Sequence, residues 1–304
     1  MLLASSITPS GAVWAESAAR KTMSTAHVVD LGEFSDHPLV AEFSESFCVT
    51  GASRVSGDVA GALASVRWTA LLLAAFDVAD SRVDPTVVVV DGSVPELVSD
   101  ACSFSALLQV SAAETPLAQR AKTMSDALAG GDVEWIVVTP PERAAMDSVT
   151  VQVAQGCALG LRVAGVLVAP MPRKRDGWPN KVRRSARGLV EQLQDRLFDI
   201  PVQRSRAGKV PVLPSRAARG IEPRGAGPLS VTISPESASL SDLSSKSDGG
   251  HVLSVTIPGL QYCDVEVGVW SQDPSYPSTH IVVRLDGVIA RIELDSTLRR
   301  CVAV

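Results

Sequence analysis

The segment from Val87 to Val90 is a run of four valines followed by Asp91 and Gly92. Strand side chains alternate between the two faces of a sheet, so four successive valines require that both faces are covered. This pattern is typical of a parallel sheet with helices on both faces. It places Asp91 at the carboxyl edge of the strand, which is where open α/β sheets bind their ligands.

Two kinds of interpretation follow for Asp91. A carboxylate at a strand end can hold a magnesium ion or orient a water molecule beside a phosphate. Alternatively, Asp91 starts a turn with Gly92, or it caps a helix that begins near Pro95. The valine run by itself leaves the functional and the structural interpretations open.

Strand and helix patterns alternate along the first 220 residues, as they do when parallel strands are joined by crossover helices. Strands are predicted at 2–5, 87–90, 133–139 and 161–170, and helices at 13–22, 59–80, 116–129 and 180–197. A further helix is expected after Thr139, which would cap it, with Gly156 and Gly160 marking its end. The spacing in the helix at 180–197 predicts four inward residues: Val182, Leu189, Leu193 and Leu197. Residues 1–220 are therefore predicted to form one α/β domain.

Residues 221–249 differ in composition from the domain before them. They are rich in Gly, Pro and Ser and poor in large apolar residues, which is typical of a flexible linker. From 250 to 304, short alternating segments predict strands, and Asp286-Gly287 predicts a hairpin turn between two of them. So small a β domain has little core of its own, and we expect it to dock on the first domain or on a second chain.

Basic residues are concentrated in one part of a chain whose net charge is -5. Those between residues 173 and 187 are Arg173, Lys174, Arg175, Lys181, Arg183, Arg184 and Arg187. Such a surface can bind nucleic acid or anionic lipid. Because Trp178 is the one aromatic residue within that stretch, the pattern favours a solvated helix face and argues against nucleic-acid binding.

Cysteine and histidine spacing argues against several kinds of site. The five cysteines lie far apart without a C-x-x-C pair, and the histidines, His27, His37, His251 and His280, are scattered, so no metal site or catalytic triad is predicted. The odd number of cysteines and the lack of a basic secretory n-region predict a cytoplasmic protein. The apolar stretch at 59–76 contains Arg67 and precedes Asp77, so we expect a buried helix and no membrane span.

Several segments match, in order, a pattern known from one family. They are Ser5-Ser6-Ile7-Thr8-Pro9-Ser10-Gly11, the strand Val87 to Asp91, Val137-Val138-Thr139-Pro140-Pro141-Glu142, the strand Val163 to Pro170, and residues 252–267. Their order resembles the anion-transporting ATPase-like family, a deviant P-loop group that includes the arsenite-pump and tail-anchored-protein-targeting ATPases. The last segment is similar to the first hairpin of the α-crystallin-like domain that ends some members. The resemblance implies a P-loop NTPase fold, a dimer, and nucleotide binding between subunits.

The nucleotide site implied by this resemblance is incomplete. A triphosphate needs a glycine-rich loop with a lysine and a hydroxyl, and G-x-x-x-x-G-K-[ST] does not occur in the sequence. The resemblance begins at the family's second strand, which implies that the first strand and the phosphate loop are missing. Thr8 stands where the family has an aspartate for the attacking water, and Ala169 where it has an asparagine for adenine. The candidate positions of a vestigial magnesium or nucleotide site are Asp91, Gly92, Ser93, Thr8 and Ser10.

Two functions of different classes are predicted. In the first, the protein is a non-catalytic member of the family, without catalytic residues or cofactor, which acts as a scaffold or partner subunit. Its partner is then a protein, either a second copy or an intact family ATPase, and the edge of the short β domain is a place where a partner strand can pair. In the alternative, the protein is an ATPase whose phosphate loop lies upstream of this sequence. ATP and Mg²⁺ are expected ligands only in that alternative.

Overall fold

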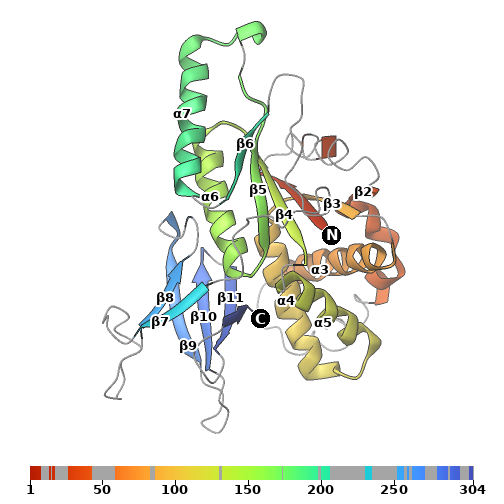
Figure 1. The fold of residues 1–304 in the computed structure, drawn as a ribbon. Coiled ribbons are helices and arrows are strands. Elements are labelled where there is room, and N and C mark those ends of the chain that lie inside the picture. The colour runs from red at the N-terminus through yellow and green to blue at the C-terminus, as the bar shows by residue number, and fades with distance from the viewer. Residues whose placement is uncertain are drawn as a thin grey trace.

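Six parallel strands form the central sheet of the protein in a computed structural model (Figure 1). The strands are β1 (Leu2–Ser6), β2 (His27–Asp30), β3 (Thr86–Asp91), β4 (Glu134–Thr139), β5 (Arg162–Val168) and β6 (Val202–Arg204), in the order β2-β3-β1-β4-β5-β6. The structure describes residues 1–7, 14, 16–17, 27–42, 59–82, 86–129, 132–172, 174–197, 200–205, 230–234, 252–256, 259, 262–270, 279–286, 288–294 and 301–303. The predicted α/β class with a parallel sheet is confirmed.

The position of β1 corrects one expectation. β1 lies at the centre of the sheet, with its backbone paired to β3 on one side and β4 on the other. In doubly wound folds the central position belongs to the first strand, and the turn after it is the one that approaches a ligand's phosphates. The resemblance had assigned this segment to a second strand and implied a missing first strand, but the sheet has no vacant position beside β1.

The helices α3 to α7 lie on one face of the sheet. The described helices are η1 (Leu31–Asp36), α3 (Val59–Asp80), α4 (Val94–Ala112), α5 (Pro116–Ala129), α6 (Arg143–Ala158), η2 (Lys174–Asp176) and α7 (Asn180–Arg196). From β2 onward every crossover moves in the same direction across the sheet, and right-handed crossovers then place their helices on the same face. Accordingly, buried residues of α3 to α7 share one core with alternate strand residues such as Leu3, Val88 and Val137.

The opposite face of the sheet is buried as well. Leu2, Val87 and Ile136 belong to a second, smaller core. The connection from β1 to β2 moves across the sheet in the reverse direction, so the same handedness rule carries it over this second face. Trp14, a helical residue of that connection, packs there. The rest of the helix predicted at 13–22, apart from Glu16 and Ser17, lies outside the described residues.

The predicted helices at 59–80 and 116–129 are confirmed, and the helix after Thr139 starts later than expected. Thr139 is the last residue of β4 and is fully buried, and its hydroxyl donates to the carbonyl of Pro140 at 3.3 Å. The residue that precedes α6 is Glu142, whose side chain makes no capping hydrogen bond. The predicted threonine cap is therefore wrong, because α6 begins only at Arg143.

Gly156 has a packing function that the sequence pattern did not suggest. It lies inside α6, where a Cβ atom would come within 2.5 Å of the Trp135 ring. Trp135 is fully buried, and its Nε1 donates to Ser5 Oγ at 2.9 Å. This glycine therefore lets a large strand side chain fit under α6. Gly160, with φ of 80°, lies just after the helix ends.

The end of α7 gives another correction. Leu193 and Leu197 are buried and Leu189 is half-buried, as predicted, but Val182 is 38% exposed. The first turns of α7 project beyond the sheet (Figure 1), and Val182 lies in the first of them. The periodicity was correct, but a neighbouring element is needed to bury a residue.

The C-terminal part of the chain contains antiparallel strands. β7 (Ser230–Ser234) pairs with β8 (Val252–Thr256), and β9 (Val265–Trp270), β10 (Thr279–Leu285), β11 (Val288–Leu294) and β12 (Cys301–Ala303) form a sheet in the order β12-β11-β10-β9. β7 lies within the predicted linker at 221–249, so five of those residues form a strand. The hairpin predicted at Asp286-Gly287 is present between β10 and β11, and Asp286 has a positive φ of 45°.

This hairpin is docked on α6. Leu285 and Val288, which flank the turn, belong to the main core, and Gln155 Nε2 donates to the Leu285 carbonyl at 2.9 Å. Gly259, with φ of 80°, packs so closely that a Cβ would lie 2.8 Å from the Thr150 carbonyl oxygen. The docking on the first domain, one of the two expected alternatives, is thus present through buried contacts. In the part of the chain that the structure describes, no helix has the length and apolar character to cross a membrane.

Candidate functional site

The carboxyl ends of β1, β3 and β4 meet at one edge of the sheet. Ser6, the last residue of β1, is level with Asp91 on β3 and with Val138 on β4. The chain leaves β1 along β4, since the Ile7 N–H donates to the Val138 carbonyl at 3.1 Å. The chain after β1 crosses toward β2 while the chain after β4 crosses toward β5, so the sheet has its topological switch point here. This edge is the place where the fold would hold a ligand.

Asp91, Gly92 and Ser93 lie at this edge as the sequence predicted, but they differ in what they do. Asp91 is exposed. Gly92 has φ of 129°, and a Cβ there would meet nothing within 4 Å, so open space surrounds it. Ser93 caps α4, because its hydroxyl accepts from the Glu96 N–H at 3.4 Å. Ser93, and not Asp91, therefore caps α4.

The other positions named from the sequence are Thr8, Ser10 and Ala169. Thr8 and Ser10 lie outside the described residues. Ala169 is 2% exposed and belongs to the smaller core, and its N–H donates to the Thr139 carbonyl at 3.0 Å. A methyl group packed in a core offers no hydrogen bond to a base edge. Ala169 therefore has a packing role.

The end of β2 adds carboxylates to the same edge of the sheet. Asp30 ends β2 and caps η1, its side chain accepting from the Gly32 N–H at 2.8 Å, while Glu33 accepts from the Asp30 N–H at 3.3 Å. Asp36 and Asp91 are exposed. The described ends of β2 and β3 thus carry acidic side chains, with no lysine or arginine among residues 1–7, 30–36 and 91–96.

These residues do not fit a magnesium nucleotide. A triphosphate carries several negative charges and is held by backbone N–H groups and cations. The described strand ends offer carboxylates, which repel phosphate, and the sequence from Ile7 to Val13 contains no lysine, one glycine, and a proline without an N–H. One carboxylate such as Asp91 can contact a magnesium ion, but it does not supply the phosphate contacts. In the described ranges there is no group of three or more His, Cys, Asp and Glu side chains that could hold a metal.

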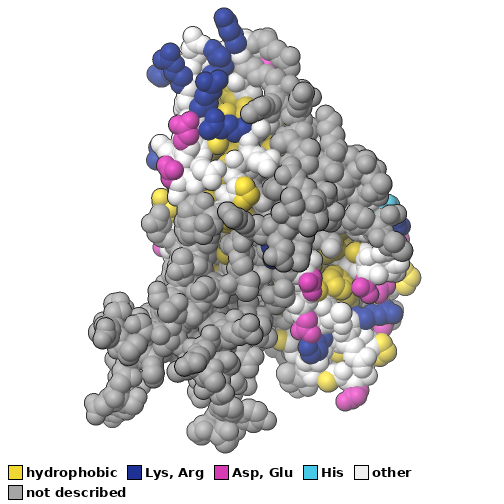
Figure 2. All heavy atoms as spheres, in the orientation of Figure 1, with side chains coloured by type: hydrophobic (Ala, Val, Ile, Leu, Met, Phe, Trp, Pro, Cys, Tyr) yellow, Lys and Arg dark blue, Asp and Glu magenta, His cyan; other side chains and the backbone are white. Residues whose placement is uncertain are grey.

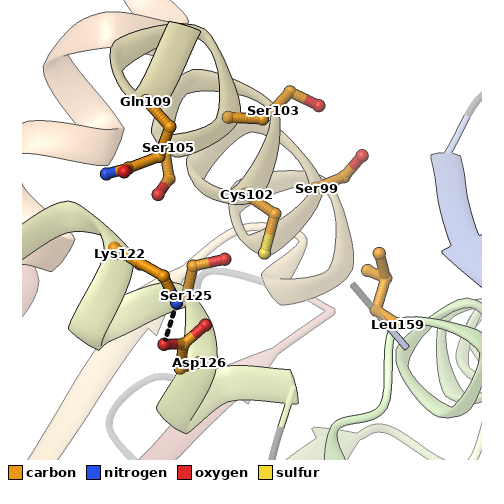
Figure 3. Close-up of a pocket in the computed structure, with 10 residues that line it drawn as sticks. Ser99, Cys102, Ser103, Ser105, Gln109, Lys122, Ser125, Asp126 and Leu159 are labelled. Atoms are coloured by element: carbon orange, nitrogen blue, oxygen red, sulfur yellow. Dashed lines mark hydrogen bonds and ion pairs between the residues drawn. The ribbon is translucent and has the colours of Figure 1, made fainter. Parts of the chain in front are cut away.

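A cavity of about 270 Å³ lies between α4 and α5 (Figure 3). Its lining includes four serines, Ser99, Ser103, Ser105 and Ser125, with Cys102, Gln109 and the Lys122–Asp126 pair at 2.6 Å. Burial raises the pKa of the Cys102 thiol, while the adjacent Ser125 hydroxyl acts in the opposite direction. Sequence reasoning missed this cavity, although polar residues recur on α4 at helical spacing from Ser99 to Gln109.

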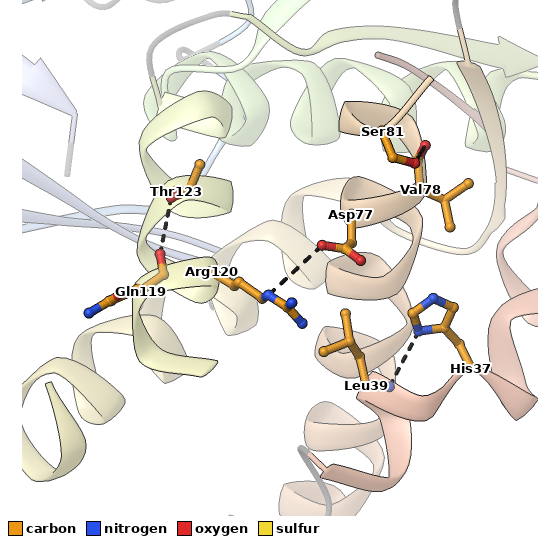
Figure 4. A network of polar contacts seen from close by, with 8 residues as sticks. All are labelled: His37, Leu39, Asp77, Val78, Ser81, Gln119, Arg120 and Thr123. Carbon is orange, nitrogen blue, oxygen red and sulfur yellow. Dashed lines mark hydrogen bonds and ion pairs between the residues drawn. The ribbon is translucent and has the colours of Figure 1, made fainter. Parts of the chain in front are cut away.

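A second hollow, of about 370 Å³, lies between α3 and α5. Asp77 on α3 and Arg120 on α5 form an ion pair at 4.0 Å across it (Figure 4). Nearby, the Leu39 N–H donates to His37 Nδ1 at 3.3 Å, which gives this histidine a local structural role. His27 is exposed at the start of β2. Neither hollow is lined by a residue from the strand ends, so neither belongs to the carboxyl-edge site.

The predicted basic face lies on the projecting end of α7. Lys174, Lys181, Arg184 and Arg187 are exposed, and Arg183 is half-buried and donates to Asn180 Oδ1. Arg173 and the side chain of Arg175 lie outside the described residues.

Comparison of the chain with models of known protein families finds no matching family, and comparison with curated proteins finds no significant match.

Proposed function

We propose that this protein is a non-catalytic interaction protein, a relative of the anion-transporting ATPases that acts as a scaffold or partner subunit. The observation that carries the proposal is the chemistry of the switch-point edge. Asp91 is exposed there next to an open glycine, while Ser93 and Asp30 are engaged in helix caps. Asp91 is a carboxylate of the kind that a magnesium site uses. The described residues around it, however, are acidic where a bound phosphate would need cations. This combination suits a fold that no longer hydrolyses nucleotide.

The joint between the sheet domain and the β hairpin supports a scaffold function. Leu285 and Val288 are buried in the main core, and Gln155 bonds to the hairpin backbone. Arg196 of α7 also stacks over the ring of Tyr262, 4.5 Å from its centroid. A hairpin fixed at several points keeps the surfaces of both parts in one relative position, which is what a platform for a partner requires.

The strand order of the C-terminal sheet supports a protein partner. β9 lies at one edge of that sheet, and the other edge is formed by β12, which has three residues. An edge strand presents backbone N–H and C=O groups that a strand from another protein can pair with. The β domain and the proposed partner contact at β9 are both part of the proposal.

The test is calorimetry of the 304-residue chain with magnesium and ATP at millimolar concentration. We expect no saturable heat for the wild type. The variants are Asp91→Ala and, as a matched exposed carboxylate before β4, Asp132→Ala. Saturable binding that is lost in Asp91→Ala and kept in Asp132→Ala would overturn the proposal in favour of an ATPase.

The partner is tested separately by size-exclusion chromatography with light scattering and by pull-down. We expect a homodimer or a stable complex with an intact ATPase of the family. A strictly solitary monomer in every mixture would contradict the role of partner subunit, whatever the calorimetry gives.

A further inference from the structure

The projecting end of α7 carries much of the positive charge of the protein. Seven of the chain's 28 Lys and Arg residues lie between 173 and 187, against one acid, Asp176. In the space-filling view the described ones gather at the extremity of the molecule, over the end of α7 (Figure 2). Among the described residues, Lys174, Lys181, Arg184 and Arg187 are exposed there. We call this surface, with Trp178 and Val182, the α7 tip.

Two exposed apolar side chains lie at the α7 tip. The buried stripe of α7 contains Leu193, Val190 and Ala186. One turn before Ala186 is Val182, which is 38% exposed, and four residues before that is Trp178, which is 50% exposed. The stripe that packs α7 onto the protein thus continues to the exposed Val182 in the first turn, and Trp178 lies exposed just before the helix begins at Asn180.

The charge of the α7 tip is not explained by the stability of the helix. The first turn of α7 contains no acid, and Pro179 before it makes no capping bond. Cations near a helix N-terminus, and like charges three or four residues apart such as Lys181 with Arg184, are unfavourable for an isolated helix. The arrangement is therefore better suited to an anionic surface outside the protein.

Shape and composition favour a lipid surface over a peptide or a nucleic acid. The α7 tip is a convex end, whereas peptides are usually held in grooves, and a flat bilayer can meet such a tip without a matching concavity. Tryptophan is favoured at the level of lipid headgroups, and Lys and Arg nearby are attracted to anionic lipids. A nucleic-acid surface would use the same cations, but it does not require a half-exposed Val beside the Trp.

We propose that the α7 tip is a docking surface for an anionic membrane. Trp178 and Val182 enter the headgroup region, and Lys174, Lys181, Arg184 and Arg187 contact anionic headgroups around them. The opposite end of the molecule, where the hairpin is docked on α6, then faces away from the bilayer (Figure 1). This surface is separate from the carboxylates at the strand ends, so the inference does not depend on whether nucleotide is bound.

The test uses the full chain without nucleotide, mixed with phosphatidylcholine vesicles with or without phosphatidylserine, and measures the fraction that sediments with the vesicles. We expect binding to the anionic vesicles only, weakened by salt because screening reduces the attraction. Replacing Lys181 and Arg184 with Gln should lower the partition coefficient about 25-fold, since each cation near an anionic surface contributes roughly fivefold. Trp178→Ala should lower it roughly tenfold through lost apolar contact.

The chain provides matched controls. Trp68 on α3 is 40% exposed, so Trp68→Ala removes a similar side chain away from the α7 tip. Arg67 and Arg82 are exposed, and replacing both with Gln removes the same charge as the Lys181 and Arg184 variant. All these controls should bind vesicles like the wild type, and the urea midpoints of all variants should match, because every altered side chain is at the surface.

Three outcomes would overturn the proposal. The first is equal binding to neutral and anionic vesicles, or no binding to either. The second is an equal loss of binding in the α7 tip variants and the controls, which would indicate a general charge effect. The third is tight binding of a mixed-sequence DNA duplex that needs Lys181 and Arg184, without vesicle binding, which would make the α7 tip a nucleic-acid surface.

Discussion

The two ends of the parallel sheet differ in how their side chains are used. Toward the amino ends of the strands, the hairpin lies against α6 with Leu285 buried, Gln155 bonded to its backbone, and Gly259 too close to Thr150 for a Cβ. At the carboxyl ends, Asp91 is exposed and Gly92 faces open space. Contacts at the first end fix the structure. Side chains at the second end can change with little cost to the fold, so this end is the more accessible to ligands and partners.

The largest loss of stability is expected from Leu285→Ala. Leu285 is fully buried in the main core, so truncation should lower the free energy of unfolding by about 2–5 kcal/mol. Val182→Ala at the exposed end of α7 is the matched control and should change stability by less than about 0.5 kcal/mol. Urea unfolding of both variants measures the difference. Similar midpoints would mean that the hairpin does not share the main core.

A smaller loss of stability is expected from Gly259→Ala. The added Cβ would lie 2.8 Å from the Thr150 carbonyl oxygen, and relief of this clash should cost about 1–3 kcal/mol. Gly177→Ala is the control, because Gly177 has a similar φ of 77° but has no atom near the added Cβ. The difference between the two variants in thermal or urea unfolding isolates the docking contact from backbone strain. Equal losses would attribute both effects to strain alone.

The third prediction concerns alkaline pH. Burial raises the pKa of the Cys157 thiol, in α6, from 9.0 to about 12. Above pH 9 the unfolded chain loses this proton while the folded protein keeps it. The contribution of Cys157 to stability is therefore complete below pH 9 and falls by about 1.4 kcal/mol per pH unit as the pH rises toward 12.

Cys157→Ala removes this part of the pH dependence. Urea unfolding of the wild type and the variant between pH 8 and about pH 10.5 should give converging stabilities, because only the wild type loses the thiol contribution. Parallel curves would show that Cys157 reaches solvent in the folded protein.

The smallest loss of stability is expected from Asp91→Ala. Asp91 is exposed, so its removal should change the free energy of unfolding by less than about 0.5 kcal/mol. Ser93→Ala, two residues away, should cost about 1 kcal/mol, because it removes the cap of α4. Chemical denaturation distinguishes the two. A loss above about 1 kcal/mol for Asp91→Ala would place Asp91 among the structural residues and weaken its assignment as a vestigial site.

Much of the fold could be predicted because it depends on local patterns. The valine run of β3, the long apolar α3 and the Asp286-Gly287 turn are where the sequence places them. The candidate site was predicted in part. The valine run placed Asp91 at the carboxyl edge of the sheet, where the structure has it, but the use of Ser93 as a cap depends on where α4 begins.

Other features depend on contacts between distant residues. Gly156 was interpreted as a helix end, yet it is required inside α6 by Trp135, more than twenty residues earlier in the chain. Thr139 was expected to cap a helix, but it is fully buried at the end of β4 and the helix begins only at Arg143. The cavity between α4 and α5 exists because two helices bring their polar faces together, which no single segment indicates.

The sequence by itself determined the α/β class, the positions of several main helices and strands, and the concentration of positive charge after residue 173, because periodicity, turn residues and charge are properties of short segments. Only the tertiary structure decided that β1 is central, that α3 to α7 share one face, and that the hairpin is docked on α6. It also decided that Val182, on the apolar stripe of α7, and Trp178, just before the helix, are exposed. Burial depends on what lies opposite a side chain, and the sequence does not state which elements meet.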